Sequence, residues 1–267
     1  MIKVNEEKCT KCGMCCEICP SGILRNGKNG PQMLLPPACI ACGHCVAICP
    51  HQAIDNENTP MLKQVNIEKF PVLDAHTAVS FLRSRRSIRS YTKEKVSKET
   101  LLELLNIARF APTGGNSQGV SFIVYETPEL LQRIIQVTVD WLEVVSQKVP
   151  ELANYKGVVS IYRKTGKDVI LRGAPQLIVA TAPGNQANGR DNGHFSLSYM
   201  ELYATAMGLG TCWAGFLEGC AQAKYQPLIE ILNIPEDRKV AGAVMVGYPK
   251  YTFQRLVDKN PLSVTWQ

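Results

Sequence analysis

Residues 9–20 read Cys-Thr-Lys-Cys-Gly-Met-Cys-Cys-Glu-Ile-Cys-Pro, and residues 39–50 read Cys-Ile-Ala-Cys-Gly-His-Cys-Val-Ala-Ile-Cys-Pro. Both stretches follow the spacing C-x2-C-x2-C-x3-C-P, and each spaced cysteine of the second lies thirty positions after its counterpart in the first. So short a segment can bury little apolar surface, so ligation by its thiolates must supply much of its folding free energy. The repeat therefore predicts a small metal-dependent module at the amino end.

The spacing resembles the signature of bacterial ferredoxins, and a tandem copy implies two [4Fe–4S] clusters. Three cysteines in a tight turn can face one cuboidal cluster, whereas the fourth is exchanged with the sister run and the proline turns the chain away. The assignment that follows places Cys9, Cys12, Cys15 and Cys49 on one cluster, and Cys39, Cys42, Cys45 and Cys19 on the other.

Structural zinc and disulfides are the alternatives for these cysteines. Zinc sites also use CxxC pairs, and disulfides require an oxidising compartment. Two full sets of four cysteines, each ending in Cys-Pro, favour clusters. Cys16 aligns with Val46 of the second run, so we expect it to be a small buried apolar side chain and not a ligand.

The 267 residues suit a domain of about 200 residues in addition to this module. No apolar run approaches the length of a membrane span and no signal-like segment precedes Cys9, so eleven cysteines predict a reducing cytoplasm and no membrane partner. Residues 1–60 carry five basic and five acidic side chains, which leaves the formal charge of +6 to the remainder. The arginines form no broad basic face, so we expect no nucleic-acid partner.

The pattern predicts three parts: a 2[4Fe–4S] module over 1–58 with a turn-rich insert at 22–37, a linker over 59–73, and an α+β domain over 74–267. The predicted helices cover 74–84, 97–110, a segment opening at Thr127-Pro128, 195–207 and 224–232. The predicted strands cover 120–125, 176–181 and 240–246. No G-x-G-x-x-G follows a strand, so a Rossmann site is not expected.

The most informative stretch of the second domain is Arg85-Arg86-Ser87-Ile88-Arg89, after its first predicted helix. Three guanidiniums around one hydroxyl suit a phosphate dianion, because arginine is always charged and can donate two parallel hydrogen bonds. Alone, such a cluster is also typical of a solvated face or a nucleic-acid contact.

From Arg85 to about Arg255 the chain resembles the FMN-dependent nitroreductase family. The arginine stretch resembles the family's phosphate motif, and residues 111–118 (Ala-Pro-Thr-Gly-Gly-Asn-Ser-Gln) resemble its loop against the ribityl chain and flavin ring, often from the partner subunit. Residues 208–215 (Gly-Leu-Gly-Thr-Cys-Trp-Ala-Gly) are similar to the turn that packs on the isoalloxazine, and Gly247-Tyr-Pro, with Lys250 behind it, is similar to the closing segment. Gly119-Val120 departs from the family's usual Pro-Trp.

The resemblance implies an α+β nitroreductase-like core that binds FMN, in a homodimer with the FMN sites at the interface. The implied contacts are Arg85, Arg86, Ser87, Arg89, Pro112, Thr113, Gly114, Asn116, Cys212, Trp213, Ala214, Gly215 and Arg255. No side chain is expected to be a catalytic acid or base, because the flavin does the covalent chemistry. His194 has no partner in the sequence that would make it a catalytic base, and a nucleophilic role is not expected for Cys212 or Cys220. Glu201 could face either the flavin or the dimer seam.

These features predict an oxidoreductase in which electrons pass between two [4Fe–4S] clusters and FMN, with reduction of a small conjugated acceptor such as a nitroaromatic, quinone or flavin. Two alternatives stay open. In the first, NAD(P)H feeds the flavin and the clusters are an exit toward an external ferredoxin. In the second, the chain is a non-enzymatic electron carrier without bound FMN.

Overall fold

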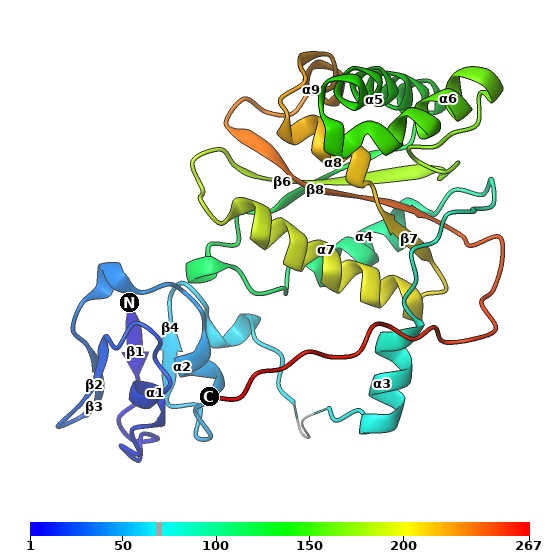
Figure 1. Ribbon diagram of the computed structural model, residues 1–267. Helices are drawn as coiled ribbons and strands as arrows, with labels where there is room; N and C mark the ends of the chain where they lie inside the picture. Colours follow the sequence, from blue (N-terminus) through cyan, green and yellow to red (C-terminus); the bar gives the residue numbers. More distant parts are fainter. Residues whose placement is uncertain (68–70) are drawn as a thin grey trace. The chain divides into compact units, whose positions relative to one another are not determined.

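The computed structural model describes residues 1–67 and 71–267, and the chain divides into two compact units. The first unit contains Met1–Val72 together with Gly115–Ser117, and the second contains Leu73–Gly114 and Gln118–Gln267. Figure 1 shows both units, coloured along the sequence from the N-terminus to the C-terminus. In the predicted linker, η2 (Met61–Lys63) is a short 3-10 helix, and residues 68–70 lie outside the described residues.

The first unit consists of short elements around the two cysteine runs. Strand β1 (Ile2–Val4) pairs antiparallel with β4 (Ile54–Asn56), and β2 (Leu24–Gly27) forms a hairpin with β3 (Gly30–Met33). This hairpin and η1 (Pro36–Ala38) occupy the insert that was predicted only as turns. Helices α1 (Met14–Glu17) and α2 (His44–Ala47) begin one residue before the third cysteine of each run, after a glycine with φ of 84° or 76°.

The second unit is built on a four-stranded antiparallel sheet in the order β5-β6-β8-β7. Its strands are β5 (Ser121–Tyr125), β6 (Gln176–Pro183), β8 (Arg238–Gly247) and β7 (Gly210–Trp213). Alternate residues of the central strands enter two different cores: Leu177 and Val179 face one, whereas Ile178 and Ala180 face the other. Because both faces are covered, β6 is an almost continuous apolar run.

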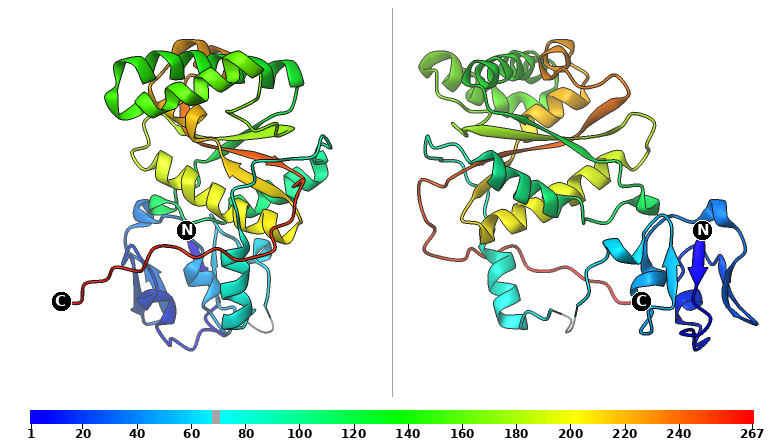
Figure 2. Two further views of the ribbon diagram at one scale, coloured as in Figure 1. Left: turned by 45° about the vertical axis from the view of Figure 1, so that its right-hand side comes forward. Right: turned by 180° about the vertical axis from the view of Figure 1, so that it is seen from behind.

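Helices cover both faces of the sheet. One face packs against α5 (Pro128–Lys148), α6 (Lys156–Thr165), α8 (Gly215–Gln222) and α9 (Gln226–Leu232), with η4 (Pro150–Tyr155) between α5 and α6. The other face packs against α4 (Lys98–Ala108) and α7 (Gly189–Ala206). Figure 2 shows these layers from two further directions. This arrangement is an α+β core with helices on both faces of one antiparallel sheet, in agreement with the α+β class predicted from the sequence.

Local sequence explains the starts of α3 and α4. Asp74 caps α3 (Ala75–Ser84) by accepting a hydrogen bond from the Thr77 N–H at 3.0 Å, and Ser97 caps α4 by accepting one from the Thr100 N–H at 3.1 Å. None of the helices formed by the described residues has the length and apolarity to cross a bilayer.

The predicted start of the long helix at residue 195 was wrong, because α7 begins at Gly189. Its first turns are buried through small and polar residues instead of an apolar stripe. A side chain at Gly193 would place its Cβ 2.5 Å from the Cβ of Ala241, so the helix approaches β8 as closely as only glycine allows. Helices α6 and α8 and strand β7 were also absent from the sequence-based elements.

Candidate functional site

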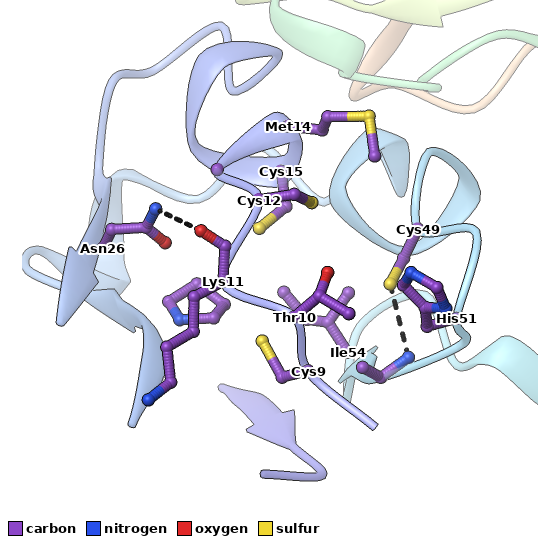
Figure 3. Close-up of a pocket in the computed structure, with 13 residues that line it drawn as sticks. Cys9, Thr10, Lys11, Cys12, Met14, Cys15, Asn26, Cys49, His51 and Ile54 are labelled. Carbon is purple, nitrogen blue, oxygen red and sulfur yellow. Dashed lines mark hydrogen bonds between the residues drawn. The ribbon is translucent and has the colours of Figure 1, made fainter. Parts of the chain in front are cut away.

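Four cysteines of the first unit surround one cavity. They are Cys9, Cys12, Cys15 and Cys49, three from the first run and one from the second. Figure 3 shows these side chains arranged around a shared space. The N–H of Ala53 donates to Cys49 Sγ at 3.3 Å, and such hydrogen bonds stabilise a thiolate.

The other four cysteines surround a second cavity: Cys19 from the first run, with Cys39, Cys42 and Cys45 from the second. The amide of Asn56 donates to Cys39 Sγ at 3.8 Å. No three His, Cys, Asp or Glu side chains among the described residues gather tightly enough to hold a single metal ion. A cuboidal cluster is held at its separate corners, so four thiols around a cavity fit its geometry and its all-cysteine donor set.

The two cavities differ in charge. The rim of the first carries the exposed cation Lys11 with exposed Asn26 and His51, beside buried Ala53 and Ile54. The described lining of the second contains no lysine or arginine: its polar residues are Ser21, exposed His44 and buried Asn56, beside buried Ile23 and Leu24. The sequence repeat is symmetric in its cysteines, and the surroundings that the hairpin insert supplies are not.

Cys16 lies outside both sets of four. Its prediction as a buried apolar residue was wrong, because the side chain is half-buried and its Sγ lies 3.7 Å from Asn26 Oδ1. Its counterpart Val46 is buried, with 5% of its surface exposed. Asn26, on strand β2 of the hairpin, thus offers the Cys16 thiol a polar acceptor.

The predicted phosphate motif forms the wall of a cavity of about 460 Å³ in the second unit. Four residues of the motif line it, together with Arg83 and three residues of the C-terminal segment: Arg85, Arg86, Ser87, Arg89, Val257, Asp258 and Lys259. The Arg86 guanidinium stacks on the ring of Phe253 at 4.7 Å. The predicted contact Arg255 is exposed and does not line this cavity, so its role stays a prediction.

The phosphate motif is joined to the predicted isoalloxazine turn. Ser87 forms a parallel bridge with Thr211 at the start of β7, and the Ile88 N–H donates to the Thr211 carbonyl at 2.8 Å. Gly210 permits this approach, since a Cβ there would lie 2.8 Å from Ile88 Cγ1. Two motifs separated by more than a hundred residues are thus one structural element.

Glu201 of α7 lies beneath this junction. It is 8% exposed, accepts a hydrogen bond from Thr211 Oγ1 at 3.0 Å, and lies 3.8 Å from Arg85 Nη1. Burial raises the pKa of Glu201, and the Thr211 hydroxyl and Arg85 oppose that shift. Glu201 therefore lies against the phosphate motif, where it faces Arg85.

A second cavity of the same unit, of about 490 Å³, is lined by predicted ring contacts. Cys212, Trp213 and Gly215 form one wall, and Arg89 lines both this cavity and the phosphate cavity. A group held at both ends would therefore place its anion among the arginines and its ring against residues 212–215. That arrangement fits FMN, which combines one phosphate with one flat ring.

The predicted loop at residues 111–118 lines neither of these cavities. Within it, Thr113 Oγ1 accepts from the Gln118 N–H at 3.1 Å, and the Gly114 N–H donates to Asn192 Oδ1 at 3.0 Å. Residues 115–117 belong to the first unit, in which Asn116 Nδ2 donates to the carbonyls of Ile40 and Ala41, each at 2.9 Å. The predicted flavin contacts of Pro112, Thr113, Gly114 and Asn116 stay predictions.

His194 has a carboxylate partner that the sequence did not reveal. His194 lies inside α7, its Nε2 is 3.0 Å from Glu218 Oε1, and its ring packs edge-on against Trp213 at 4.7 Å. Glu218 is 4% exposed and also accepts hydrogen bonds from Arg190, Trp213 and Gln222. This buried carboxylate fixes Trp213 and was missed, although Arg190 and His194 stand four apart, a spacing that shares one helix face.

Cys212 and Cys220 are both buried in the core of the second unit. Burial raises the pKa of the Cys212 thiol, and it raises that of Cys220 to about 12. The raised pKa favours the protonated thiol in both groups.

Two family models match this chain, one over the cysteine runs and one over the second domain. Residues 82–248 match the model of the nitroreductase family, and residues 8–54 match that of a 4Fe–4S dicluster domain. The first match spans the arginine motif, the residue 111–118 loop and β7. The second spans all eight cysteines of the two cavities.

The regions that match this chain make up most of the length of individual relatives. An iodotyrosine deiodinase from Thermotoga neapolitana is 24% identical over 171 residues, which are 62% of this chain and 86% of the relative. An NADH dehydrogenase from Thermus thermophilus is 28% identical over 197 residues, 67% of this chain and 88% of the relative. The structure of a nitroreductase with bound FMN from Bacteroides fragilis superposes with a TM-score of 0.57 at 19% identity, over 70% of this chain and 98% of that one.

Proposed function

Because the chain belongs to the nitroreductase family and carries a 4Fe–4S dicluster domain, we propose that it is an iron–sulfur flavoprotein in which two [4Fe–4S] clusters and FMN exchange electrons and a small conjugated acceptor is reduced. When bound, the clusters supply single electrons and FMN supplies the two-electron chemistry. The candidate acceptors are nitroaromatics, quinones and flavins.

One observation carries this proposal: eight cysteines divide into two cavities of four, each with three from one run and one from the other. This is the exchange that the spacing predicts for a two-cluster module. In the other unit, Arg89 links the phosphate cavity to the cavity beside Trp213. The chain's own residues thus offer thiolates for two clusters and guanidiniums for one phosphate.

We include in the proposal the domain organisation and a homodimer. The parts are the cluster module over 1–58, a linker over 59–73 and the FMN domain over 74–267. Residues 111–114 and 118, which belong to the second unit, line neither the phosphate cavity nor the cavity beside Trp213, which supports their use to complete the site of a second copy.

The donor has two candidates. A reduced ferredoxin could feed the clusters, or NAD(P)H could feed the flavin with the clusters as the exit. The name of the Thermus thermophilus relative, an NADH dehydrogenase, favours testing NADH. The non-enzymatic carrier is not retained, because family membership makes the chain a flavin oxidoreductase.

The test of this proposal is the composition of protein purified anaerobically without reconstitution. We expect about eight iron atoms and about eight acid-labile sulfides per chain, as two [4Fe–4S] clusters require, together with one extractable FMN. Protein without iron, sulfide and FMN would contradict the proposal. Protein with FMN and zinc in place of iron would contradict its cluster half alone.

The two clusters are expected to differ in reduction potential. Reduction adds negative charge, which water, hydrogen-bond donors and cations stabilise and apolar burial disfavours. The cavity with the cation Lys11 on its exposed rim should therefore hold the cluster of higher potential, and the one whose described lining carries no lysine or arginine the cluster of lower potential.

A redox titration followed by paramagnetic resonance measures both potentials. Lys11→Gln should lower the higher potential by on the order of tens of millivolts, since it removes a cation beside that cluster. Lys28→Gln is the matched control. Lys28 is exposed in the same unit of the chain, between β2 and β3, and lines neither cavity. Equal potentials, or a shift of the lower one, would contradict this order.

A further inference from the structure

The cavity beside Trp213 is lined by more side chains than the predicted contacts of a flavin ring. At about 490 Å³ it lies within the range of small-molecule sites, roughly 300–1,000 Å³. Beyond the residue 212–215 segment it is lined by the aromatic side chains of Trp141, Tyr155 and Phe216. Tyr155 and Phe216 contact each other edge to face, with centroids 5.0 Å apart. These walls suit a flat conjugated molecule.

Two guanidiniums, those of Arg89 and Arg172, line the same cavity. Neither takes part in any ion pair that the described residues form. Their charges lie near the buried thiol of Cys212, where both favour its ionised form. The cavity is therefore apolar in its walls and carries positive charge that no described carboxylate neutralises, a combination that attracts an anion.

Arg89 belongs to the phosphate motif, so Arg172 is the cation left for another ligand. A rigid loop presents it: the Asp168 carboxylate accepts hydrogen bonds from the N–H groups of Ile170, Leu171 and Gly173, at 2.9, 2.8 and 2.7 Å. Arg172 itself has φ of 59°, which is uncommon outside glycine. Ile170 and Leu171 are 3% and 1% exposed, so packing holds this conformation.

We propose that this cavity binds the acceptor and that Arg172 pairs with an anionic group on it, so that the acceptor class is a planar conjugated molecule bearing a carboxylate. The planar fork of a guanidinium matches a carboxylate through two parallel hydrogen bonds, and the aromatic walls take the ring. The inference rests on the proposed function, because residues 212–215 supply both the predicted flavin contact and one wall of the cavity.

Equilibrium binding to the oxidised protein, as purified, tests this assignment. The probes are 4-nitrobenzoate and its neutral match 4-nitrobenzamide, followed by quenching of tryptophan fluorescence, since Trp141 and Trp213 line the cavity. Wild type is expected to bind the carboxylate at least about tenfold more tightly, as a charge-assisted pair implies.

Arg172→Gln is expected to weaken binding of 4-nitrobenzoate by about 10- to 100-fold and to change binding of 4-nitrobenzamide by less than about twofold. Glutamine keeps a β-carbon at this left-handed position, so the backbone cost is unchanged. Arg172→Lys retains the charge without the fork and should recover part of the loss. Arg133→Gln is the matched control, because Arg133 is exposed on α5 and does not line the cavity.

Three results would overturn the assignment. Equal binding of both probes by wild type would show that no anion is selected. Equal weakening of both probes by Arg172→Gln, or a loss of FMN from that variant, would show that Arg172 serves the fold or the cofactor. Failure of the proposed function is distinguishable, because it appears as wild-type protein without FMN, whereas the fluorescence titration reads the cavity directly.

Discussion

Replacing Cys49 with alanine is expected to remove the cluster held by Cys9, Cys12 and Cys15 and to spare the other cluster. The reason is the exchange between runs, since Cys49 lies on the cavity of the first run although it belongs to the second in sequence. Cys19→Ala should do the reverse, because Cys19 lines the cavity of Cys39, Cys42 and Cys45. A lost thiolate leaves one iron without its protein ligand, and the cluster's binding free energy is also folding free energy.

Iron analysis and paramagnetic resonance measure this outcome. Each variant should retain about four iron atoms per chain and one of the two cluster signals, and the signals lost should differ between the variants. Cys16→Ala is the matched control, since its thiol is half-buried in the same unit and does not line either cavity. If each variant damaged the cluster of its own run, the assignment would be refuted.

Replacing Arg85 and Arg89 together is expected to abolish retention of FMN. The two guanidiniums line the phosphate cavity, and charge-assisted hydrogen bonds to a phosphate are each worth about 1.5–3 kcal/mol. Losing both should weaken FMN binding at least about 100-fold, since 1.4 kcal/mol corresponds to tenfold. The measurement is extractable FMN per chain, followed by titration of the stripped protein with FMN.

The double variant needs a companion, because Arg85 faces the buried Glu201. Arg85→Ala alone leaves that carboxylate without its cation, so Glu201→Gln is added to separate loss of FMN from loss of stability. Arg109→Ala is the matched control, since its guanidinium stacks on Phe110 and does not line either cavity of the second unit. Full FMN content in the Arg85 and Arg89 variant would refute the phosphate site, and iron content should stay unchanged throughout.

The sequence predicted the elements whose signals are local. The spacing of the cysteines can be read directly from the sequence. Each of the two cavities groups three cysteines of one run with the fourth cysteine of the other, as that spacing predicts. Caps such as Asp74 and Ser97 lie beside the helices they start. The arginine motif is also contiguous, so its residues reach one cavity together.

The features that escaped prediction depend on partners distant in sequence. In the sequence, nothing distinguishes Glu218 from other helical glutamates. In the fold it contacts Arg190 and His194 of α7 and Trp213 of β7. The true start of α7 was hidden because glycine contact with β8, and not an apolar stripe, buries its first turns. Arg172 carries no motif, and only the folded loop around Asp168 places it in a cavity.

The central claim is that the clusters and FMN form one electron path within the chain. Its most direct test is the anaerobic rate at which an external reduced ferredoxin bleaches FMN, in wild type and in the Cys19→Ala/Cys49→Ala variant at matched FMN content. The account predicts rapid bleaching in wild type and a rate at least about tenfold slower without the clusters. Equal rates in the two proteins would contradict it.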